Sequence, residues 1–449
     1  MMRSLLNLLA AEAFLASTLI LARHDFHDAL SPLPGISYKI PEPGHRSPTN
    51  YKVTKTNFLR LHAVKGDGTN SRSAAAILGS HQRAVPGGGG YQNITSATSL
   101  GTQYAMDILL QDTPMQVYLD TGSSDTWFVQ RDFLCTDYGG VVIPQEACGF
   151  GPGYAGDFQY GAIPGQHCFI LYGDGEMIYG PVGYSDITVA NITVKRQEIA
   201  FANTTYWYGN NVTSGVLGLA YPSLTNAYLG TGMEHDWLDA ASYPPLFSTM
   251  VSDGLVQPFF AIAISRNSSG GLIGFGGIPP ISGLDYSTAA TTDIIITNLV
   301  DNPFTSWEYS FYTIIPDGFV WDGTTNTDKY PMIMDTGTTL LYLPPPLAEA
   351  INNAFRPAAV WIWQYGAFFT ACNAKAPNLA VIIKGVKFFI NPVDLIYKDI
   401  VDPLTGLCMT GISSGGAGPY ILGDVFLQNA MAIFDVGNSK MRFIGRSYY

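Results

Sequence analysis

Residues 120–124 read Asp-Thr-Gly-Ser-Ser and residues 335–339 read Asp-Thr-Gly-Thr-Thr, so one five-residue pattern occurs twice, 215 positions apart. A single Asp-Thr-Gly is expected by chance in roughly one chain of this length in ten, whereas two copies that are each followed by two hydroxyl residues are not. Each copy follows an apolar run, residues 115–119 and 330–334, which predicts a short buried strand that ends at a carboxylate. An ordinary Asp-Gly turn is the alternative, but a turn requires neither the repeated Thr nor the repeated hydroxyl.

The residue types in this pattern suit a catalytic pair of carboxylates. Two carboxylates held close together cannot both ionise at low cost, so one keeps a proton and the pair can act as acid and base at once. A water held between Asp120 and Asp335 would then become a nucleophile. The Gly allows backbone to approach closely, and the hydroxyls of Ser123 and Thr338 can donate hydrogen bonds that orient the carboxylates. We therefore expect Asp120 and Asp335 to be catalytic, with support from Thr121, Gly122, Ser123, Thr336, Gly337 and Thr338.

Further motifs accompany the two copies. An apolar-apolar-Gly segment follows each Asp, at residues 216–218 and 421–423. Tyr-Gly-Asp-Gly at residues 172–175 lies between the first Asp and the first of these segments, and Trp127 follows the first Asp by seven residues. With the Gly-Phe-Gly-Gly at 274–277, these motifs resemble those of the pepsin-like aspartic peptidases, and the resemblance runs from about residue 100 to the end.

The resemblance implies an all-β fold with a few short helices, in which two pseudo-symmetric lobes, residues 89–275 and 276–449, flank a central cleft. It implies an aspartic endopeptidase that needs no cofactor or metal and favours large apolar side chains beside the scissile bond. A flap would close over a polypeptide substrate in extended conformation. The flap and substrate-binding residues would be Tyr172, Gly173 and Asp174, with Trp127 hydrogen-bonded to the tyrosine.

Three features depart from the pattern of the family. Asp112 stands where relatives usually have Gly, and Thr339 stands where they often have Ser. We expect these two residues to alter a turn and a hydroxyl without changing the chemistry. The stretch between Trp127 and Tyr172 is long and Gly-rich, which predicts an inserted surface loop near the cleft and bears on substrate preference.

Length and composition agree with a folded β protein. The chain has 449 residues, of which 47% are hydrophobic and 13% charged, so it can form two or three units with an ample core and is unlike a disordered chain. Frequent Gly, Thr, Ser, Tyr and Val residues favour strands. A helix is expected at residues 346–355.

The N-terminal residues differ from the rest in charge. Residues 1–22 are mainly apolar after an Arg and are predicted to be a secretory signal peptide, with a signal anchor as the alternative. Residues 23–84 hold nine Lys or Arg against four Asp or Glu, a formal +5, and residues 85–449 hold 13 against 30, a formal −17. A basic tail that binds nucleic acid or an anionic surface is one interpretation of this asymmetry.

The resemblance instead implies that residues 23–88 are a basic propeptide that lies across the acidic cleft and inhibits the enzyme. The four glycines at 87–90 would then be a linker to the mature enzyme. A propeptide lysine would block the two carboxylates, and the candidates are Lys52, Lys55 and Lys65.

Sequons and cysteines suit the secretory pathway. The possible glycosylation sites are Asn93, Asn191, Asn203, Asn211 and Asn267. The resemblance implies a Cys372–Cys408 disulfide, and it favours Cys135–Cys148 while leaving the pairing among Cys135, Cys148 and Cys168 open. Only two of the seven histidines lie beyond residue 84, so we expect no zinc site.

Two other function classes are alternatives to an endopeptidase. An inactive relative could keep the cleft as a binding module or as an inhibitor, but it would be free to lose an Asp, a Gly or the flap Tyr, and this chain keeps all of them. A polysaccharide hydrolase would explain the paired carboxylates and not the flap motif. We expect a monomer without a nucleic-acid partner or membrane anchor, either secreted or held in a vacuole-like compartment.

Overall fold

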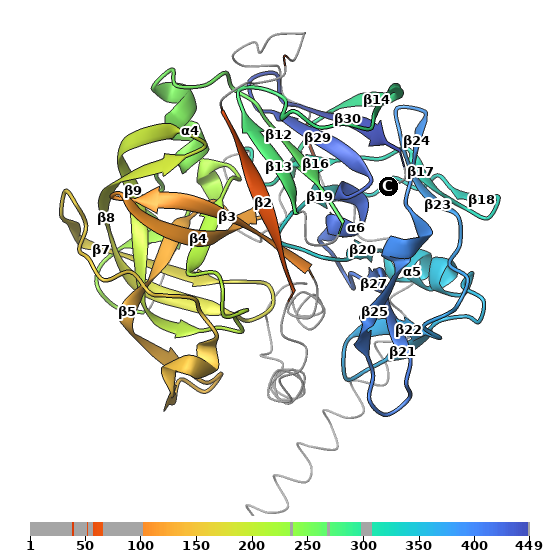
Figure 1. Ribbon diagram of the computed structural model, residues 1–449, viewed down its shortest axis with the longest axis horizontal. Coiled ribbons are helices and arrows are strands. Elements are labelled where there is room, and N and C mark those ends of the chain that lie inside the picture. The colour runs from red at the N-terminus through yellow and green to blue at the C-terminus, as the bar shows by residue number, and fades with distance from the viewer. Residues whose placement is uncertain are drawn as a thin grey trace, which may run out of the picture. The chain divides into compact units, whose positions relative to one another are not determined.

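The computed structural model describes residues 38–39, 52, 57–65, 102–233, 237–266, 270–297 and 308–447 (Figure 1). The predicted signal peptide, the glycine linker, Lys55, Asn93 and Asn267 lie outside the described residues. Strands dominate and the helices are few and short, so the prediction of a mainly β fold is confirmed. No helix in the described part of the chain combines the length and the apolar character needed to cross a membrane.

Fifteen strands form one large sheet. In pairing order they are β11 (Ala227–Leu229), β7 (Ala162–Leu171), β8 (Met177–Val189), β9 (Ile192–Tyr206), β5 (Thr126–Thr136), β10 (Gly215–Gly218), β4 (Thr113–Asp120), β3 (Thr102–Leu110), β2 (Phe58–Lys65), β13 (Gly271–Phe275), β12 (Phe260–Ile264), β29 (Ala430–Asp435), β30 (Lys440–Arg446) and β14 (Leu284–Asp293), with β6 (Val142–Ile143) paired to β5. The sheet therefore runs from the first half of the chain, through β2, into the last strands of the second half.

The second half contributes three smaller sheets. The first is ordered β16 (Thr313–Ile314), β19 (Met332–Met334), β28 (Tyr420–Leu422), β20 (Leu341–Leu343) and β27 (Ile412–Ser414). The second is ordered β18 (Thr324–Asn326), β17 (Gly318–Trp321), β23 (Leu379–Ile383) and β24 (Val386–Phe389), and the third β21 (Val360–Ile362), β22 (Ala367–Thr370), β26 (Cys408–Thr410) and β25 (Ile396–Val401). A separate pair joins β1 (Tyr38–Lys39) to β15 (Ile296–Thr297).

The described residues form three α-helices, α4 (Leu246–Ser252), α5 (Pro345–Asn352) and α6 (Asp424–Leu427). Helix α5 corresponds to the helix predicted at 346–355, but it ends three residues earlier. The side-chain amide of Asn352 donates to the carbonyls of Ala348 and Ile412, which ties the last turn to β27. Pro357 follows closely and cannot continue a helix, so the chain turns away.

Alternation along β4 decides which side chains reach the functional site. Met115, Val117 and Leu119 are buried in the main core. Tyr118 and Asp120, which alternate with them along the strand, therefore point to the opposite face. The turn before β4 contains Asp112, whose φ of 69° is in the left-handed region that Gly favours and Asp tolerates. The Asp at this position thus belongs to the turn and lies away from the chemistry.

Candidate active site

Each Asp-Thr-Gly copy follows a strand that pairs in parallel with an apolar-apolar-Gly strand. Strand β4 ends at Asp120 and pairs with β10, so that Gly218 lies opposite Asp120. Strand β19 leads directly into Asp335 and pairs with β28, which precedes Gly423. The two halves of the chain thus build the same local structure around their Asp.

The two glycines of these segments lie against the neighbouring chain. A Cβ on Gly218 would be 2.5 Å from the carbonyl carbon of Ser124, and a Cβ on Gly423 would be 2.2 Å from the carbonyl oxygen of Thr338. Any side chain would therefore push the catalytic loop out of place, which explains why both segments end in Gly.

Each carboxylate is held by its own loop in the same way. The Gly122 N–H donates to Asp120 Oδ1 at 2.7 Å and the Ser123 hydroxyl to Oδ2 at 2.5 Å. In the second copy the corresponding distances are 2.8 Å from Gly337 and 2.6 Å from Thr338, both to Asp335. These four donors hold both carboxylates in a defined orientation.

The two loops face each other across their glycines. A Cβ on Gly122 would be 2.6 Å from Asp335 Oδ1, and a Cβ on Gly337 would be 2.6 Å from Asp120 Oδ1. Each Gly therefore makes room for the carboxylate of the other half, which brings Asp120 and Asp335 together.

Thr121 and Thr336 join the two loops. The Thr121 hydroxyl accepts from the Thr336 N–H at 3.0 Å and donates to the carbonyl of Met334 at 2.9 Å. The Thr336 hydroxyl accepts from the Thr121 N–H at 3.1 Å and donates to the carbonyl of Leu119 at 3.0 Å. Both threonines are buried, so these four hydrogen bonds link the halves out of contact with water.

Burial raises the pKa of both carboxyls. For Asp120 the hydrogen bonds from Ser123 and Gly122 oppose this effect. For Asp335 the negative charge of Asp120 raises the pKa further. Burial and the repulsion between the two charges therefore favour a state in which the pair keeps one proton.

A third carboxyl, that of Asp424, lies near the pair at the start of α6. It is 1% exposed, and neither oxygen has a hydrogen-bond partner among the described residues. Burial raises its pKa well above the ordinary value, and the charges of Asp335 and Asp120 raise it further. Burial and the neighbouring charges thus favour the protonated form of Asp424.

Residues 172–176 form the turn between β7 and β8. The Tyr172 N–H donates to the Glu176 carbonyl at 2.8 Å, and Gly175 has a φ of 86°. Trp127 Nε1 donates to the Tyr172 hydroxyl at 2.8 Å, so the structure brings together the two residues that the resemblance paired. Trp207, on the loop after β9, packs edge-on against both rings.

Four glycines between Trp127 and Tyr172 lie close to neighbouring atoms, namely Gly149, Gly151, Gly153 and Gly156. A Cβ on Gly151 would be 2.2 Å from the carbonyl oxygen of Val212, and one on Gly149 would be 2.8 Å from that of Gly209. Phe150 between them stacks on Trp207. The insertion therefore supports the aromatic wall beside the turn at 172–176.

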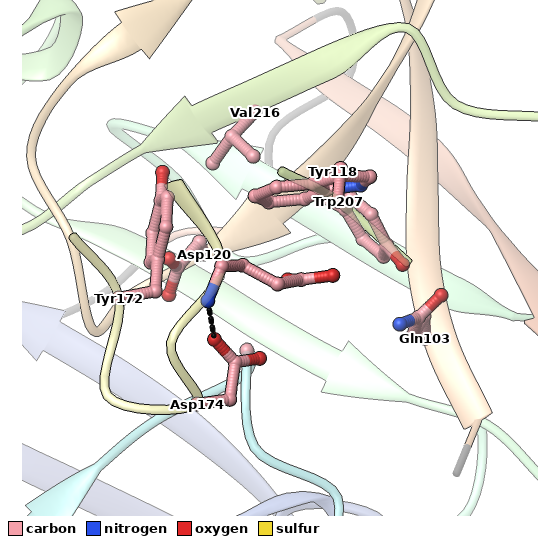
Figure 2. A pocket seen from close by; sticks show the side chains of 9 residues that line it. Gln103, Tyr118, Asp120, Tyr172, Asp174, Trp207 and Val216 are labelled. Atoms are coloured by element: carbon pink, nitrogen blue, oxygen red, sulfur yellow. Dashed lines mark hydrogen bonds between the residues drawn. The ribbon is translucent and has the colours of Figure 1, made fainter. Parts of the chain in front are cut away.

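A pocket of about 490 Å³, which includes space open to solvent, lies between this turn and the catalytic loops (Figure 2). Asp120 and Gly337 mark its catalytic end. The other lining residues are Gln103, Tyr118, Tyr172, Asp174, Glu176, Trp207 and Val216. Sequence reasoning singled out Tyr172 and Asp174 and missed most of the others, because their approach depends on strand pairing. Glu176 had a local signal, since it follows Asp174 by two residues.

The remaining predicted residues lie away from the pocket. Disulfides join Cys135 to Cys148 and Cys372 to Cys408, and Cys168 is a buried free thiol. Asn191 and Asn211 are exposed and Asn203 is partly buried. Among the residues that the structure describes, no group of three or more His, Cys, Asp or Glu is arranged to hold a metal ion.

Comparison with known proteins gives consistent matches. Residues 103–445 match the family model described as eukaryotic aspartyl protease. A probable aspartic-type endopeptidase of Aspergillus fumigatus is 36% identical over 409 residues, which cover 88% of this chain and 89% of the relative. Gastricsin of Rattus norvegicus is 28% identical over 349 residues, which cover 73% of this chain and 77% of the relative. The crystal structure of the aspartic proteinase from Irpex lacteus superposes with a TM-score of 0.56 at 19% identity, covering 77% of this chain and 95% of that one.

Proposed function

Because this chain belongs to the eukaryotic aspartyl proteases, we propose that it is an acid endopeptidase in which Asp120 and Asp335 activate a water molecule. The observation that carries this proposal is the symmetry of the two loops. Each carboxylate is held by a Gly N–H and a hydroxyl of its own loop and faces the Gly of the other loop. Such a pair can hold one proton and one negative charge at acid pH.

The charge of Asp120, which raises the pKa of Asp335 further, supports a division of the two roles. Asp120, ionised, removes a proton from the water as its oxygen attacks the carbonyl carbon of the scissile peptide. Asp335 gives its proton to the carbonyl oxygen, which forms a tetrahedral diol. The diol then collapses as Asp120 delivers its proton to the leaving nitrogen and Asp335 regains one from a diol hydroxyl. No covalent enzyme intermediate forms.

The turn at 172–176 is proposed to act as the flap. Tyr172 and Asp174 line the same pocket as Asp120, and the Trp127 hydrogen bond holds the tyrosine. Backbone groups of Gly173 and Gly337 would hydrogen-bond to an extended polypeptide as a strand does. Closure of the flap would exclude water other than the reacting molecule.

We further propose that residues 23–88 inhibit the enzyme as a propeptide. Strand β2, inside this range, pairs with both β3 and β13, and Leu61 is fully buried. Cleavage near residues 80 to 92 would therefore release a strand that the precursor uses in its main sheet. The formal +5 on residues 23–84 against −17 on the remainder supports an electrostatic contribution to this association.

The cellular route of the protein is proposed on the same basis. Residues 1–22 would direct it to the secretory pathway as a cleaved signal, and the mature enzyme would be a secreted monomer, with a vacuole-like compartment as the alternative. Asn191 and Asn211 are accessible to glycosylation, whereas Asn203 is partly covered. The two disulfides suit an oxidising compartment.

Digestion of denatured casein at acid pH, with and without a statine-type inhibitor, tests the proposed function. Asp120→Asn and Asp335→Asn should each abolish cleavage while leaving folding unchanged, because each Asp acts through proton transfer. Asp253→Asn is a matched control, since this exposed Asp is the C-cap of α4 and belongs to neither Asp-Thr-Gly loop. Residual activity above about 1% of the parent in either catalytic variant would contradict the assignment.

A further inference from the structure

The turn at 172–176 is in contact with a tyrosine of another loop, the hairpin that joins β5 to β6. Gly175 has a φ of 86°, which favours Gly, so the turn has no side chain of its own at this position. A Cβ on Gly175 would be 3.9 Å from Cε2 of Tyr138. Apart from the two chain neighbours of Gly175, no other atom of the described residues lies within 4 Å of that point. The edge of the Tyr138 ring therefore covers the backbone of the turn.

The hairpin holds this tyrosine in a defined place. The Gly139 and Val141 N–H groups both donate to Asp137 Oδ1 at 2.9 Å, and the Asp137 N–H donates to the Val141 carbonyl at 2.9 Å. Strand β5 pairs with β6, and the Cys135–Cys148 disulfide joins the start of the hairpin to the segment that follows it. Strand β5 is also part of the main sheet, so the hairpin is fixed to the body of the first half of the chain.

The same ring also contacts the strands that support the turn. The ring centroids of Tyr138 and Tyr206 are 5.7 Å apart with an interplanar angle of 70°, an edge-on contact. Tyr206 ends β9 and pairs with Met177, which begins β8 directly after the turn. The hydroxyls of Tyr206 and Tyr208 are hydrogen-bonded, and the Tyr208 N–H donates to Glu176 Oε1 at 2.7 Å. The hairpin is thus connected to the turn both directly and through these two tyrosines.

The turn that Tyr138 contacts lies over the catalytic end of the pocket. Tyr172 and Asp174 line the same pocket as Asp120 (Figure 2), whereas Tyr138 is not among the lining residues. Trp127 bonds to Tyr172, the first residue of the turn, and Tyr138 contacts the fourth. A movement of the turn away from the pocket would separate it from the Tyr138 ring, because the hairpin is held independently. The contact therefore stabilises the position in which the turn covers Asp120.

We propose that Tyr138 is a positioning residue that holds the turn at 172–176 over the pocket and thereby raises the affinity for a polypeptide substrate. A substrate that binds only while the turn covers the pocket has its apparent affinity reduced by the fraction of molecules in that state. Loss of the ring lowers this fraction, whereas a saturating substrate restores it. This inference rests on the proposed endopeptidase function and adds to it a residue outside the pocket that controls the flap.

Tyr138→Ala tests the proposal, with a peptide substrate at acid pH and the activated enzyme. KM should rise about two- to tenfold, the range expected for one lost aromatic contact. The value of kcat should stay within about twofold of the parent, because bound substrate keeps the turn in place. A statine-type inhibitor should dissociate faster by a factor similar to that in KM. Tyr138→Phe keeps the ring and should behave as the parent does.

Tyr160→Ala is the matched control, because Tyr160 and Tyr138 are each 42% exposed. Tyr160 lies just before β7, at the end of that strand away from the turn, and Arg196 stands over its ring at 5.6 Å. Its loss should leave KM unchanged. Asp137→Ala removes the acceptor that shapes the hairpin and should raise KM in the same direction as Tyr138→Ala. Combined with Tyr138→Ala it should add less than its effect alone, since both changes act through one contact.

An unchanged or lower KM in Tyr138→Ala overturns the proposal, as does a fall in kcat at constant KM. A Tyr138→Phe variant as impaired as Tyr138→Ala would also overturn it, because the effect would then belong to the hydroxyl. An equal rise of KM in Tyr160→Ala would show that the effect is not local to the turn and has the same consequence. If the activated parent cuts no peptide, the proposed endopeptidase function fails and the inference fails with it. Cleavage by the parent and by Tyr138→Ala with equal KM values sinks the inference alone.

Discussion

Replacing Thr121 by Val removes one hydroxyl and nearly keeps the shape of the side chain. In the parent this hydroxyl accepts from the Thr336 N–H at 3.0 Å and donates to the Met334 carbonyl at 2.9 Å, and Thr121 is 0% exposed. The variant loses two hydrogen bonds and leaves the Thr336 N–H buried without its partner. A lost bond costs about 0.5–1.5 kcal/mol and an unsatisfied buried donor about 1–3 kcal/mol, so we expect a total of about 2–4 kcal/mol.

Thr121→Ser is the matched control, because it keeps the hydroxyl and loses only a methyl group. Its cost should be about 1 kcal/mol, from the lost burial and a small cavity. Urea unfolding of the full-length protein at neutral pH, followed by tryptophan fluorescence, should therefore rank the parent as most stable, then Ser, then Val. Thr336→Val should match Thr121→Val, since each hydroxyl makes the same two kinds of bond.

The Thr121→Val/Thr336→Val double variant should lose less stability than the sum of the two single variants, because the two threonines belong to one network. The Val variants should also cut casein more slowly at saturating substrate, since the loops that hold the carboxylates are no longer tied together. If the Ser and Val variants unfold at the same urea concentration, the cross-link does not stabilise the protein and this reasoning is refuted.

Three further outcomes are expected. Removing the Cys372–Cys408 bridge, which closes a loop of 36 residues, should lower the free energy of unfolding by about 4 kcal/mol. Removing the Cys135–Cys148 bridge, which closes a loop of 13 residues, should lower it by about 3 kcal/mol. If the variant with both cysteines of the longer loop changed to Ser were the more stable of the two, the loop-length argument would be contradicted. Burial raises the pKa of Asp424, so the folded state holds a proton that the unfolded chain releases above about pH 4. Above that pH the free energy of unfolding of Asp424→Asn should exceed that of the parent by a margin that grows by up to about 1.4 kcal/mol per pH unit. An equal margin at about pH 3 would refute this. The protein purified from residue 23 onward should be latent at pH 7 and lose mass as it becomes active at about pH 4, because the body loses negative charge while the basic segment keeps its own; full activity without loss of the segment would contradict the propeptide.

The pairing of Asp120 with Asp335 could be predicted because each copy of the repeat consists of consecutive residues that can be recognised in the sequence. The mainly β class followed from composition and from the resemblance, and the structure bears it out. The roles of Ser123 and Thr338 could also be predicted from the sequence, since each hydroxyl donates a hydrogen bond to the carboxylate three residues earlier in its own loop. Local geometry of this kind can be inferred from spacing alone.

The role of the repeated Thr could not be predicted from the sequence in the same way. The partners of Thr121 lie 213 and 215 residues away, so its hydrogen bonds exist only once two parallel strand pairs have brought the loops together. The raised pKa of Asp424 likewise depends on burial and on the charges of Asp335 and Asp120, which are distant in the sequence. The resemblance implied a basic propeptide, but the charge pattern gave no indication that residues 58–65 form a strand of the main sheet.

The hydrogen bonds that hold the catalytic loops and those that hold the flap carboxyls involve different residues. The loops depend on backbone groups and hydroxyls within the two Asp-Thr-Gly copies. Glu176 is bonded through the Tyr208 N–H and supports Asp174, and neither bond involves those copies. A change at Glu176 therefore removes none of the four loop hydrogen bonds that hold Asp120 and Asp335. The turn at 172–176 and the catalytic loops are held by separate contacts, so a substitution that disturbs one set leaves the hydrogen bonds of the other in place.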